Sequence, residues 1–232
     1  MKYISIFSGI EAASVAWRNL GWTPLAFSEI DPFPCAILKH YYPDVPNLGD
    51  IRNVDWSPYR GKVDLIVGGS PCQSFSIAGE RNGMAGASGL VTQFFRILRE
   101  VTPKWFVFEN VPGMLSSSKG EDFRLILKGW EECGYHVAWT TLNAEFFGVP
   151  QRRRRVFTVG HLRDWRCPVK VLFDPESLCG DSKKGCEKRK ATSRGTHASS
   201  SVSQSVAKCL TSRNERYDFE TENFIVQDPS RL

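Results

Sequence analysis

The sequence predicts an α/β fold in which helices cover a doubly wound, mostly parallel β-sheet. Between Met1 and His161, short apolar runs alternate with stretches of helical periodicity. Several of these runs end directly in Gly, Ser or Glu, as strands do where they open into loops at one edge of a sheet. Because ligands of such folds bind outside the carboxyl ends of the strands, we expect the functional residues at those ends.

The first strand, turn and helix lie at the N-terminus. Tyr3–Phe7 is a compact apolar strand, and Glu11–Leu20 has helical periodicity and ends before Gly21. Gly9 in the turn lets the backbone approach a ligand, with the N-terminus of the helix behind it. One glycine is a weak signal for nucleotide binding, so this turn does not establish a cofactor site by itself.

The second unit repeats this arrangement. Pro24–Ser28 is extended, and Asp31 with Pro32 forms an N-cap and first-turn pair for a helix that reaches Tyr42. Glu29 stands between strand and helix. In doubly wound folds an acidic residue at this place accepts hydrogen bonds from ribose hydroxyls, and the alternative is a plain acid at the start of a helix.

A polar break at Gly49–Ile51 follows the second helix. Asp50 in this break is suited to present a carboxylate to an adenine amino group, but the same residue pattern is typical of an ordinary turn. The residues leave both interpretations open.

The loop Gly68–Ser76, GGSPCQSFS, follows the β-branched strand Val63–Val67. Pro71 restricts the backbone before Cys72, and Gln73 keeps the following side polar, so the thiol is held on a loop at a strand end. This is the placement of a nucleophile. The alternative is a buried structural cysteine, which is the commoner fate of a free thiol but rarely has these neighbours.

The remaining elements continue the alternation of strands and helices. Helices are predicted at Leu90–Val101 and Asp122–Cys133, and strands at Trp105–Phe108, Tyr135–Leu142 and Val156–Gly160. Glu109 follows the first of these strands and is a second acidic candidate, unless it only caps a helix.

Composition indicates one well-buried domain and a smaller region. The chain has 232 residues, of which 41% are hydrophobic and 24% charged. We expect a catalytic domain over residues 1–162 and a short, partly disordered region over residues 163–232. The second region is rich in Ser, Lys, Gly and Thr over Asp174–Ser205, which has few large apolar residues.

The composition also predicts a cytoplasmic protein with reduced thiols. No run is long enough for a membrane span or a signal peptide. The seven cysteines lack paired CxxC spacing, which argues against a disulfide framework and against a metal site. The net charge of +5 comes largely from Arg152–Arg155 and Lys183–Lys190, as in proteins that bind polyanions.

Six short motifs occur in order along the chain: FSGI, SEID, GDI, SPCQSFS, ENV and QRRRRVF. Each is weak alone, but together they span nearly all of Met1 to His161. In their order and separations the sequence resembles the cytosine-C5 DNA methyltransferases of bacterial or phage restriction-modification or Dcm-like type. Two departures are Glu11 and Ala12 in place of a glycine pair, and Ser70 before Pro71 in place of a double proline. Neither removes a group that the chemistry requires.

The resemblance implies a Rossmann-like fold that binds S-adenosylmethionine. Glu29 would bind the ribose, Ile30 would pack against the adenine, and Asp50 with Ile51 would lie at the adenine edge. The full set of implied cofactor residues is Phe7, Gly9, Ile10, Glu29, Ile30, Asp50, Ile51 and Pro71.

The resemblance also implies a covalent mechanism. Cytosine C5 is a poor nucleophile, so the Cys72 thiolate adds to C6 and makes an enamine whose C5 accepts the methyl group. Glu109 would neutralise the charge that builds at ring N3, an effect of about 10² to 10⁴ in rate for a positioned acid. Arg153 and Arg155 alternate along an extended segment and would face the base, suited to its carbonyl O2.

Double-stranded DNA is the implied partner, with the target base flipped out of the duplex. Gln73 and Ser76 would hold the emptied backbone, and Arg152 and Arg154 would contact phosphates. The alternative for the whole arginine run is a solvated basic stretch that contacts phosphate only.

The C-terminal region resembles a short target-recognition segment. The sequence contains no RExxRxQGFP block and no terminal GN block, which in the family complete the cofactor site. We therefore expect a second polypeptide to supply them. Two alternatives remain: a truncated, catalytically silent relative that binds DNA or cofactor, and a tRNA cytosine-C5 methyltransferase.

Overall fold

The computed structural model describes residues 1–71 and 89–173. Six strands form one sheet in the order β2-β1-β3-β4-β6-β5. The first four strands are parallel, and β6 is antiparallel to both β4 and β5. The strands are β1 (Lys2–Ile6), β2 (Thr23–Ser28), β3 (Leu65–Gly68), β4 (Trp105–Asn110), β5 (Tyr135–Asn143) and β6 (Arg154–Leu162). The predicted fold class is confirmed.

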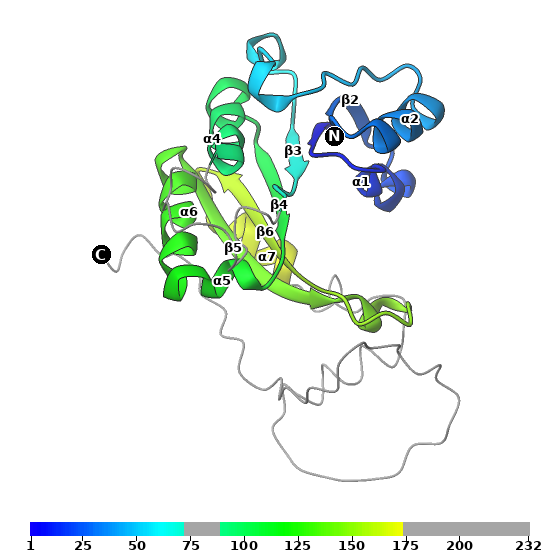
Figure 1. The fold of residues 1–232 in the computed structure, drawn as a ribbon. Coiled ribbons are helices and arrows are strands. Elements are labelled where there is room, and N and C mark those ends of the chain that lie inside the picture. Colours follow the sequence, from blue (N-terminus) through cyan, green and yellow to red (C-terminus); the bar gives the residue numbers. More distant parts are fainter. Residues whose placement is uncertain (72–88, 174–232) are drawn as a thin grey trace.

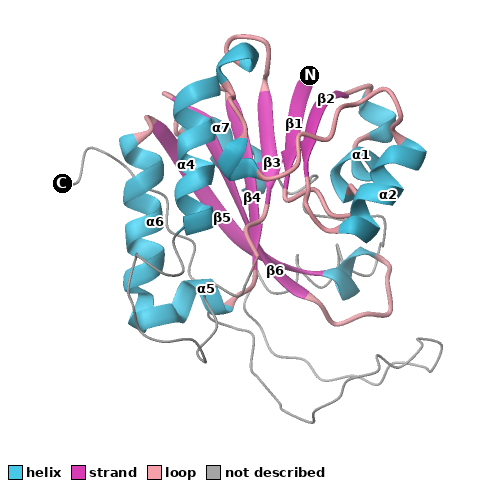
Figure 2. Ribbon diagram, turned by 45° about the horizontal axis from the view of Figure 1, so that its top comes forward, coloured by secondary structure: helices cyan, strands magenta, loops and turns pink. Residues whose placement is uncertain are grey.

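Helices cover both faces of this sheet (Figure 2). They are α1 (Ala12–Ala16), α2 (Pro32–Tyr41), α4 (Gly89–Val101), α5 (Gly113–Ser116), α6 (Glu121–Glu132) and α7 (Arg166–Phe173). On one face α4 and α6 bury a cluster of aromatic rings, in which Phe94 contacts Phe106 and Phe108 edge to face. On the other face α7 packs Leu172 against Ala138 and Val159. Burial of this apolar surface is the main stabilising contribution to the fold.

The first helix is shorter than predicted. The expected helix Glu11–Leu20 ends at Ala16, and a separate 3₁₀ turn covers Arg18–Leu20. Trp17 leaves the helical region with φ −101° and ψ 8°, and its ring packs edge-on against Tyr3. The aromatic contact with the sheet therefore outweighs helix propensity at this position.

Two further differences extend the folded part. Strand β4 continues past Phe108 because Glu109 and Asn110 pair with Phe157 and Val156 of β6. Helix α7 is absent from the elements that the sequence predicts, and it lies against the sheet up to Phe173. The predicted boundary between residues 1–162 and 163–232 stays a prediction.

The strand order places a topological switch point between β1 and β3. From β1 the chain moves to β2 on one side, and then returns to add β3 on the other side. Crevices at such points hold the ligands of doubly wound folds. The long β5–β6 hairpin projects beyond the other strands (Figure 1). No helix among residues 1–71 and 89–173 is long and apolar enough to cross a membrane.

Candidate active site

The loop between β1 and α1 begins the candidate site. Phe7, Gly9 and Glu11 have positive φ angles of 51°, 54° and 65°, so the chain turns sharply over a few residues. Gly9 adopts this backbone at little cost because it has no Cβ. Its amide N donates a hydrogen bond of 2.7 Å to Glu29 Oε2. The loop is thereby tied to the carboxyl end of β2.

Glu29 lies directly after β2, as the sequence predicts. Its Oε1 accepts hydrogen bonds from the backbone amides of Ile30 at 2.8 Å and Asp31 at 2.9 Å. A carboxylate has about four acceptor sites, and three backbone amides use most of them here. Two ribose hydroxyls would therefore have to share an oxygen with these amides or displace one of them.

Asn47, which no sequence motif singles out, joins Glu29 to the polar break at Gly49–Ile51. Its Oδ1 accepts from the amides of Glu29 at 3.0 Å and Gly49 at 3.2 Å. Its Nδ2 donates to the carbonyl of Glu29 at 3.1 Å and to Cys35 Sγ at 3.2 Å. Nothing in the residue pattern around Pro46 indicated this role, because it depends on which strand the segment lies beside.

Asp50 caps the 3₁₀ turn Ile51–Asn53. Its carboxylate accepts from the Arg52 amide at 3.0 Å and forms an ion pair with Arg52 Nη2 at 2.6 Å. Hydrogen bonds from the Arg52 side chain hold the pKa of Asp50 below its usual range. The carboxylate is therefore ionised at neutral pH, but any adenine amino group must compete with Arg52 for it.

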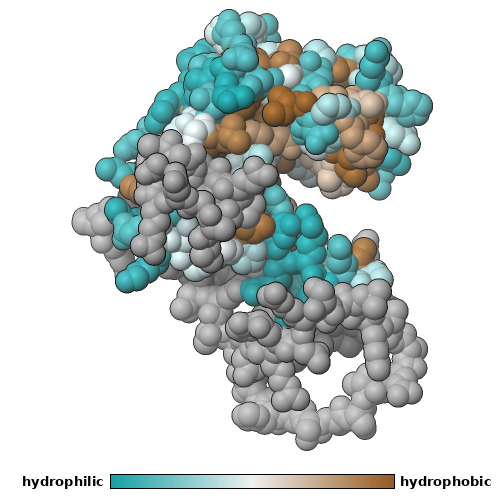
Figure 3. All heavy atoms as spheres, in the orientation of Figure 1, coloured by the Kyte–Doolittle hydropathy of each residue, from teal (hydrophilic) through white to brown (hydrophobic). Residues whose placement is uncertain are grey.

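Apolar side chains lie exposed beside these polar groups. Ile10, which follows Gly9, is 59% exposed, and Ile30, which follows Glu29, is 66% exposed. Phe7 packs against the core, whereas Ile51 is fully part of it. Figure 3 shows hydrophobic residues gathered over the α1–α2 region. Exposed aliphatic groups around a carboxylate suit a ligand with both an apolar ring and hydroxyl groups.

Two glycines bring β3 close to its neighbours. A Cβ on Gly68 would lie 2.3 Å from the carbonyl oxygen of Ile6, and one on Gly69 would lie 2.5 Å from that of Glu109. The absence of a side chain at these two positions therefore lets the backbone of β1 and β4 approach closely. After them, Asn110 Nδ2 donates to the carbonyl of Ser70 at 3.3 Å. Strand β4 thus positions the start of the loop.

Pro71 is exposed and is the last described residue of this loop. The predicted nucleophile Cys72 and the predicted DNA contacts Gln73 and Ser76 lie outside the described residues. Their roles stay predictions.

Glu109 and Arg155 come together across β4 and β6. Arg155 Nε lies 2.8 Å from Glu109 Oε1, and both side chains remain partly accessible. The guanidinium is oriented further by its hydrogen bond of 2.8 Å to the Arg154 carbonyl. A carboxylate and a guanidinium from different strands therefore meet beside Gly69, at the edge that carries Glu29.

The other three arginines are placed differently. Arg153 and Arg152 precede β6 and are exposed, while Arg154 is half-buried at its first position. The amide of Arg153 donates to Asn143 Oδ1 at 3.1 Å, which fixes the backbone where the hairpin begins. Of the two arginines predicted to face the base, Arg155 is the one that forms an ion pair with Glu109.

Glu11 is an unexpected buried acid beneath the first loop. Its Oε1 accepts from the amide and hydroxyl of Ser14 at 3.0 and 2.9 Å, while Oε2 is buried without a partner. Burial raises the pKa of Glu11 by more than hydrogen bonds from Ser5 and Ser14 lower it. Burial also raises the pKa of Tyr3, to about 12, so its hydroxyl stays neutral where it meets Ser14. No group of His, Cys, Asp and Glu suited to a metal ion occurs in the part of the chain that the structure describes.

Comparison with known proteins gives the family context. The family described as "C-5 cytosine-specific DNA methylase" matches residues 1–228. The chain is 40% identical over 177 residues to the type II methyltransferase M.AquIA of Picosynechococcus, covering 69% of this chain and 71% of that protein. It is 36% identical over 230 residues to a protein of Escherichia phage P1 named DNA N-6-adenine-methyltransferase. That match covers 76% of this chain but only 30% of the phage protein.

A solved structure supports the fold. The DNMT2 mutant from Spodoptera frugiperda superposes with a TM-score of 0.58 at 23% identity, covering 70% of this chain and 50% of that chain. At this identity the likeness concerns the fold alone. The chain spans about a third of the phage P1 protein and half of the DNMT2 chain.

Proposed function

Because the chain belongs to the family of C-5 cytosine-specific DNA methylases, we propose that it transfers a methyl group to C5 of cytosine in double-stranded DNA. The observation that carries the proposal is the Glu109–Arg155 pair of 2.8 Å, which stands beside the start of the loop that continues to Cys72. A nucleophile next to a paired acid and guanidinium is what addition to a pyrimidine ring requires.

The methyl donor of this family is S-adenosylmethionine, and the described residues fit it. Glu29 offers a carboxylate at the end of β2, with exposed Ile10 and Ile30 near it. In the proposal Glu29 accepts the ribose hydroxyls, Ile30 covers one face of the adenine, and Asp50 with Ile51 lines its edge. The backbone of Phe7, Gly9 and Ile10 lies along the rest of the S-adenosylmethionine molecule. Pro71 closes the side of the cofactor site that faces Cys72.

In the proposed reaction the thiolate of Cys72 forms a bond to C6 of the flipped base, and electrons of the C5–C6 double bond move toward N3. Glu109, which carries or shares a proton with N3, neutralises the charge there, and Arg155 orients Glu109 through their contact of 2.8 Å. C5 then bonds to the methyl carbon as the carbon–sulfur bond of the donor breaks toward sulfur. Loss of the C5 proton to a base reforms the double bond and expels the thiolate, so the enzyme returns unchanged.

The DNA contacts are proposed for the hairpin side. Figure 3 shows open space between the α1–α2 region and the end of the β5–β6 hairpin on this face. Arg152 and Arg153 precede β6 and Arg154 is its first residue, and their charges suit phosphates and the base carbonyl. The comparisons lend no support to the predicted second polypeptide, and the proposal is made for DNA alone.

Two other substrates are weighed against this one. The name of the phage P1 relative concerns adenine N6, but amino-group methylation needs no cysteine nucleophile, and this chain covers a minor part of that protein. A tRNA substrate uses the same C5 chemistry. The likeness to DNMT2 carries no argument for it at 23% identity.

The test is a trapping experiment. DNA duplexes containing 5-fluorocytosine, which has no C5 proton to lose, should form a complex with the protein and S-adenosylmethionine that survives denaturation. Cys72→Ala should abolish the complex. Cys35→Ala and Cys133→Ala should retain it, because these thiols lie on α2 and after α6.

A trapped complex with Cys72→Ala would contradict the assigned nucleophile. Substituted tRNA in place of the duplex tests the alternative substrate. Absence of trapping with both nucleic acids, while cofactor still binds, would favour the catalytically silent relative.

A further inference from the structure

The segment Asn47–Val54, which contains Asp50 and Ile51, has little secondary structure to hold it. On one side it pairs with β2 through a single bridge between Phe27 and Asn47. Beyond this bridge the segment forms the 3₁₀ turn Ile51–Asn53, which lies beside α4. A residue that holds this turn in place therefore also fixes the positions of Asp50 and Ile51, which are proposed to contact the adenine.

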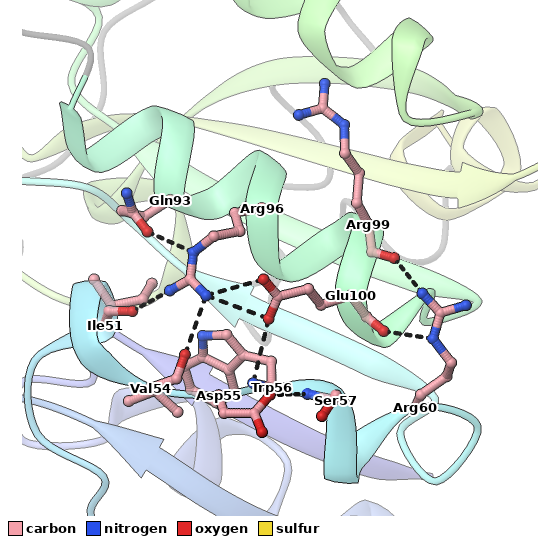
Figure 4. A network of polar contacts seen from close by, with 10 residues as sticks. All are labelled: Ile51, Val54, Asp55, Trp56, Ser57, Arg60, Gln93, Arg96, Arg99 and Glu100. Atoms are coloured by element: carbon pink, nitrogen blue, oxygen red, sulfur yellow. Dashed lines mark hydrogen bonds and ion pairs between the residues drawn. The ribbon is translucent and has the colours of Figure 1, made fainter.

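Arg96 of α4 spans the turn (Figure 4). Its Nη2 donates to the carbonyl of Ile51 at 2.5 Å, and its Nη1 donates to the carbonyl of Val54 at 3.1 Å. One planar guanidinium therefore holds both the first residue of the turn and the residue after it. The Ile51 side chain is 3% exposed within the core, so side chain and carbonyl of this residue are both fixed.

The guanidinium is itself held in place. Its Nε donates to Gln93 Oε1 at 2.7 Å, and its Nη1 lies 3.0 Å from Glu100 Oε1. Glu100 Oε2 also accepts from the Trp56 amide at 3.2 Å. Arg96 and Glu100 are 30% and 32% exposed, so solvent screens this pair less than a surface pair.

We propose that Arg96 is a positioning residue for cofactor recognition. It holds Asp50 and Ile51 in the position in which they contact the edge of the adenine ring. This rests on the proposed function of the same site. Arg96 acts through the Ile51 carbonyl and touches no substrate. A lysine cannot replace it fully, because a single ammonium group cannot present the fork that reaches two carbonyls and Glu100.

Two cofactor analogues separate this role from general stability. S-adenosylhomocysteine has an amino group at position 6 of its base, and S-inosylhomocysteine has a carbonyl there. Calorimetry on the wild-type protein should give about tenfold tighter binding of the first, the ratio expected for one hydrogen bond to a charged group. Arg96→Met, which keeps the apolar stem, should reduce this ratio to about twofold or less by weakening the adenosyl compound.

Matched variants complete the experiment. Arg99→Met changes the same residue type on the same helix, where its side chain is exposed and its pair with Glu132 is long at 3.8 Å, and it should keep the full ratio. Arg96→Lys should give an intermediate ratio and a melting temperature near that of the wild type, which decides the matter if Arg96→Met does not fold. Glu29→Ala, which removes the proposed ribose ligand, should weaken both analogues equally.

The outcomes are distinct. Equal weakening of both analogues by Arg96→Met and Arg96→Lys would overturn the positioning role while leaving the proposed function in place. Equal binding of the two analogues by the wild type would overturn it as well, since no adenine edge would then exist at Asp50–Ile51. Failure of the wild type to bind S-adenosylhomocysteine at all would instead count against the proposed function.

Discussion

At the scale of single residues, the buried acid Glu11 makes the stability of the folded chain depend on pH. One carboxyl oxygen accepts two hydrogen bonds from Ser14, and the other is buried without a partner. Burial favours the neutral form, so the pKa in the folded chain lies above the unfolded value. An acid with a raised folded pKa contributes stability while it is protonated, below the unfolded pKa, and this contribution is lost as the pH rises through the folded pKa.

We therefore predict that Glu11→Gln stabilises the protein at pH 8. The amide keeps an oxygen for Ser14 and needs no burial of charge. The expected rise in melting temperature is about 2 to 4 °C, the shift that 1 kcal/mol produces in a chain of this size. The difference should narrow as the pH falls toward 4.5, the ordinary value for the carboxyl group.

Glu145→Gln is the matched control, because Glu145 is exposed on the β5–β6 hairpin. Thermal melts of both variants across pH 4.5 to 8 measure the effect. A Glu11→Gln protein that melts below the wild type at pH 8 would show that the ionised carboxylate has partners that offset its burial.

At the scale of elements, the end of β3 packs tightly against β4 at the carboxyl edge of the sheet. Gly68 pairs with Phe108 of β4, and Gly69 follows with its Cα facing Glu109. A methyl group here would lie 2.5 Å from the Glu109 carbonyl oxygen and 2.8 Å from its Oε2. The carbonyl belongs to a strand and cannot move alone, so a side chain at this position must displace β4 or the loop.

Gly69→Ala is therefore predicted to impair methyl transfer more than stability. Overpacking of this kind costs about 1 to 3 kcal/mol in unfolding free energy. Displacement of Glu109 should lower the single-turnover rate by about 10²-fold, the lower end of what a positioned acid supplies. Rapid-quench methylation assays and thermal melts on the same preparation give the two numbers.

Gly113→Ala provides the comparison, since a Cβ there would meet only Val111 Cγ2 at 4.0 Å. It should leave the rate unchanged and keep or raise the melting temperature, because alanine is the better helix former at the start of α5. A Gly69→Ala enzyme with the wild-type rate would argue against a role for Glu109 at this edge.

At the scale of the whole molecule, charge is distributed unevenly around the fold. The formal net charge is +5, and the arginine run Arg152–Arg155 lies where the β5–β6 hairpin leaves the sheet. Helix α6 carries basic residues too, and Arg124 there is paired with Glu121 at 2.8 Å. In Figure 1 this helix lies away from the projecting end of the β5–β6 hairpin. Release of counterions from DNA follows the local charge that meets the phosphates.

We predict that Arg152→Ala and Arg154→Ala each reduce the salt dependence of DNA binding. The slope of log K against log salt should fall by about 0.9 for each phosphate that the variant no longer neutralises. Fluorescence anisotropy on duplexes of unrelated sequence should show the same decrease on each of them. Arg124→Ala changes the net charge equally and should keep the slope. A similar decrease for Arg124→Ala would mean that net charge, and not the hairpin, governs binding.

The sequence by itself determined the fold class and most of the elements. Strand and helix periodicities are local, so Pro24–Ser28 and Trp105–Phe108 were found within two residues of the observed strands β2 and β4. The order of the motifs also led to the family, which its profile over residues 1–228 confirms. Glu29 and Glu109 were singled out because strand ends meet at one edge of a parallel sheet.

Only the tertiary structure decided which groups meet. The ion pair between Glu109 and Arg155, the anchoring of Gly49 by Asn47 and the hold of Arg96 on Ile51 all join residues that are distant in sequence or belong to irregular segments. The break at Trp17 had the same origin, since its ring prefers Tyr3 of the sheet to another helical turn. Such contacts depend on strand order and register, and these are set by the packing of the whole chain, which no local pattern of residues contains.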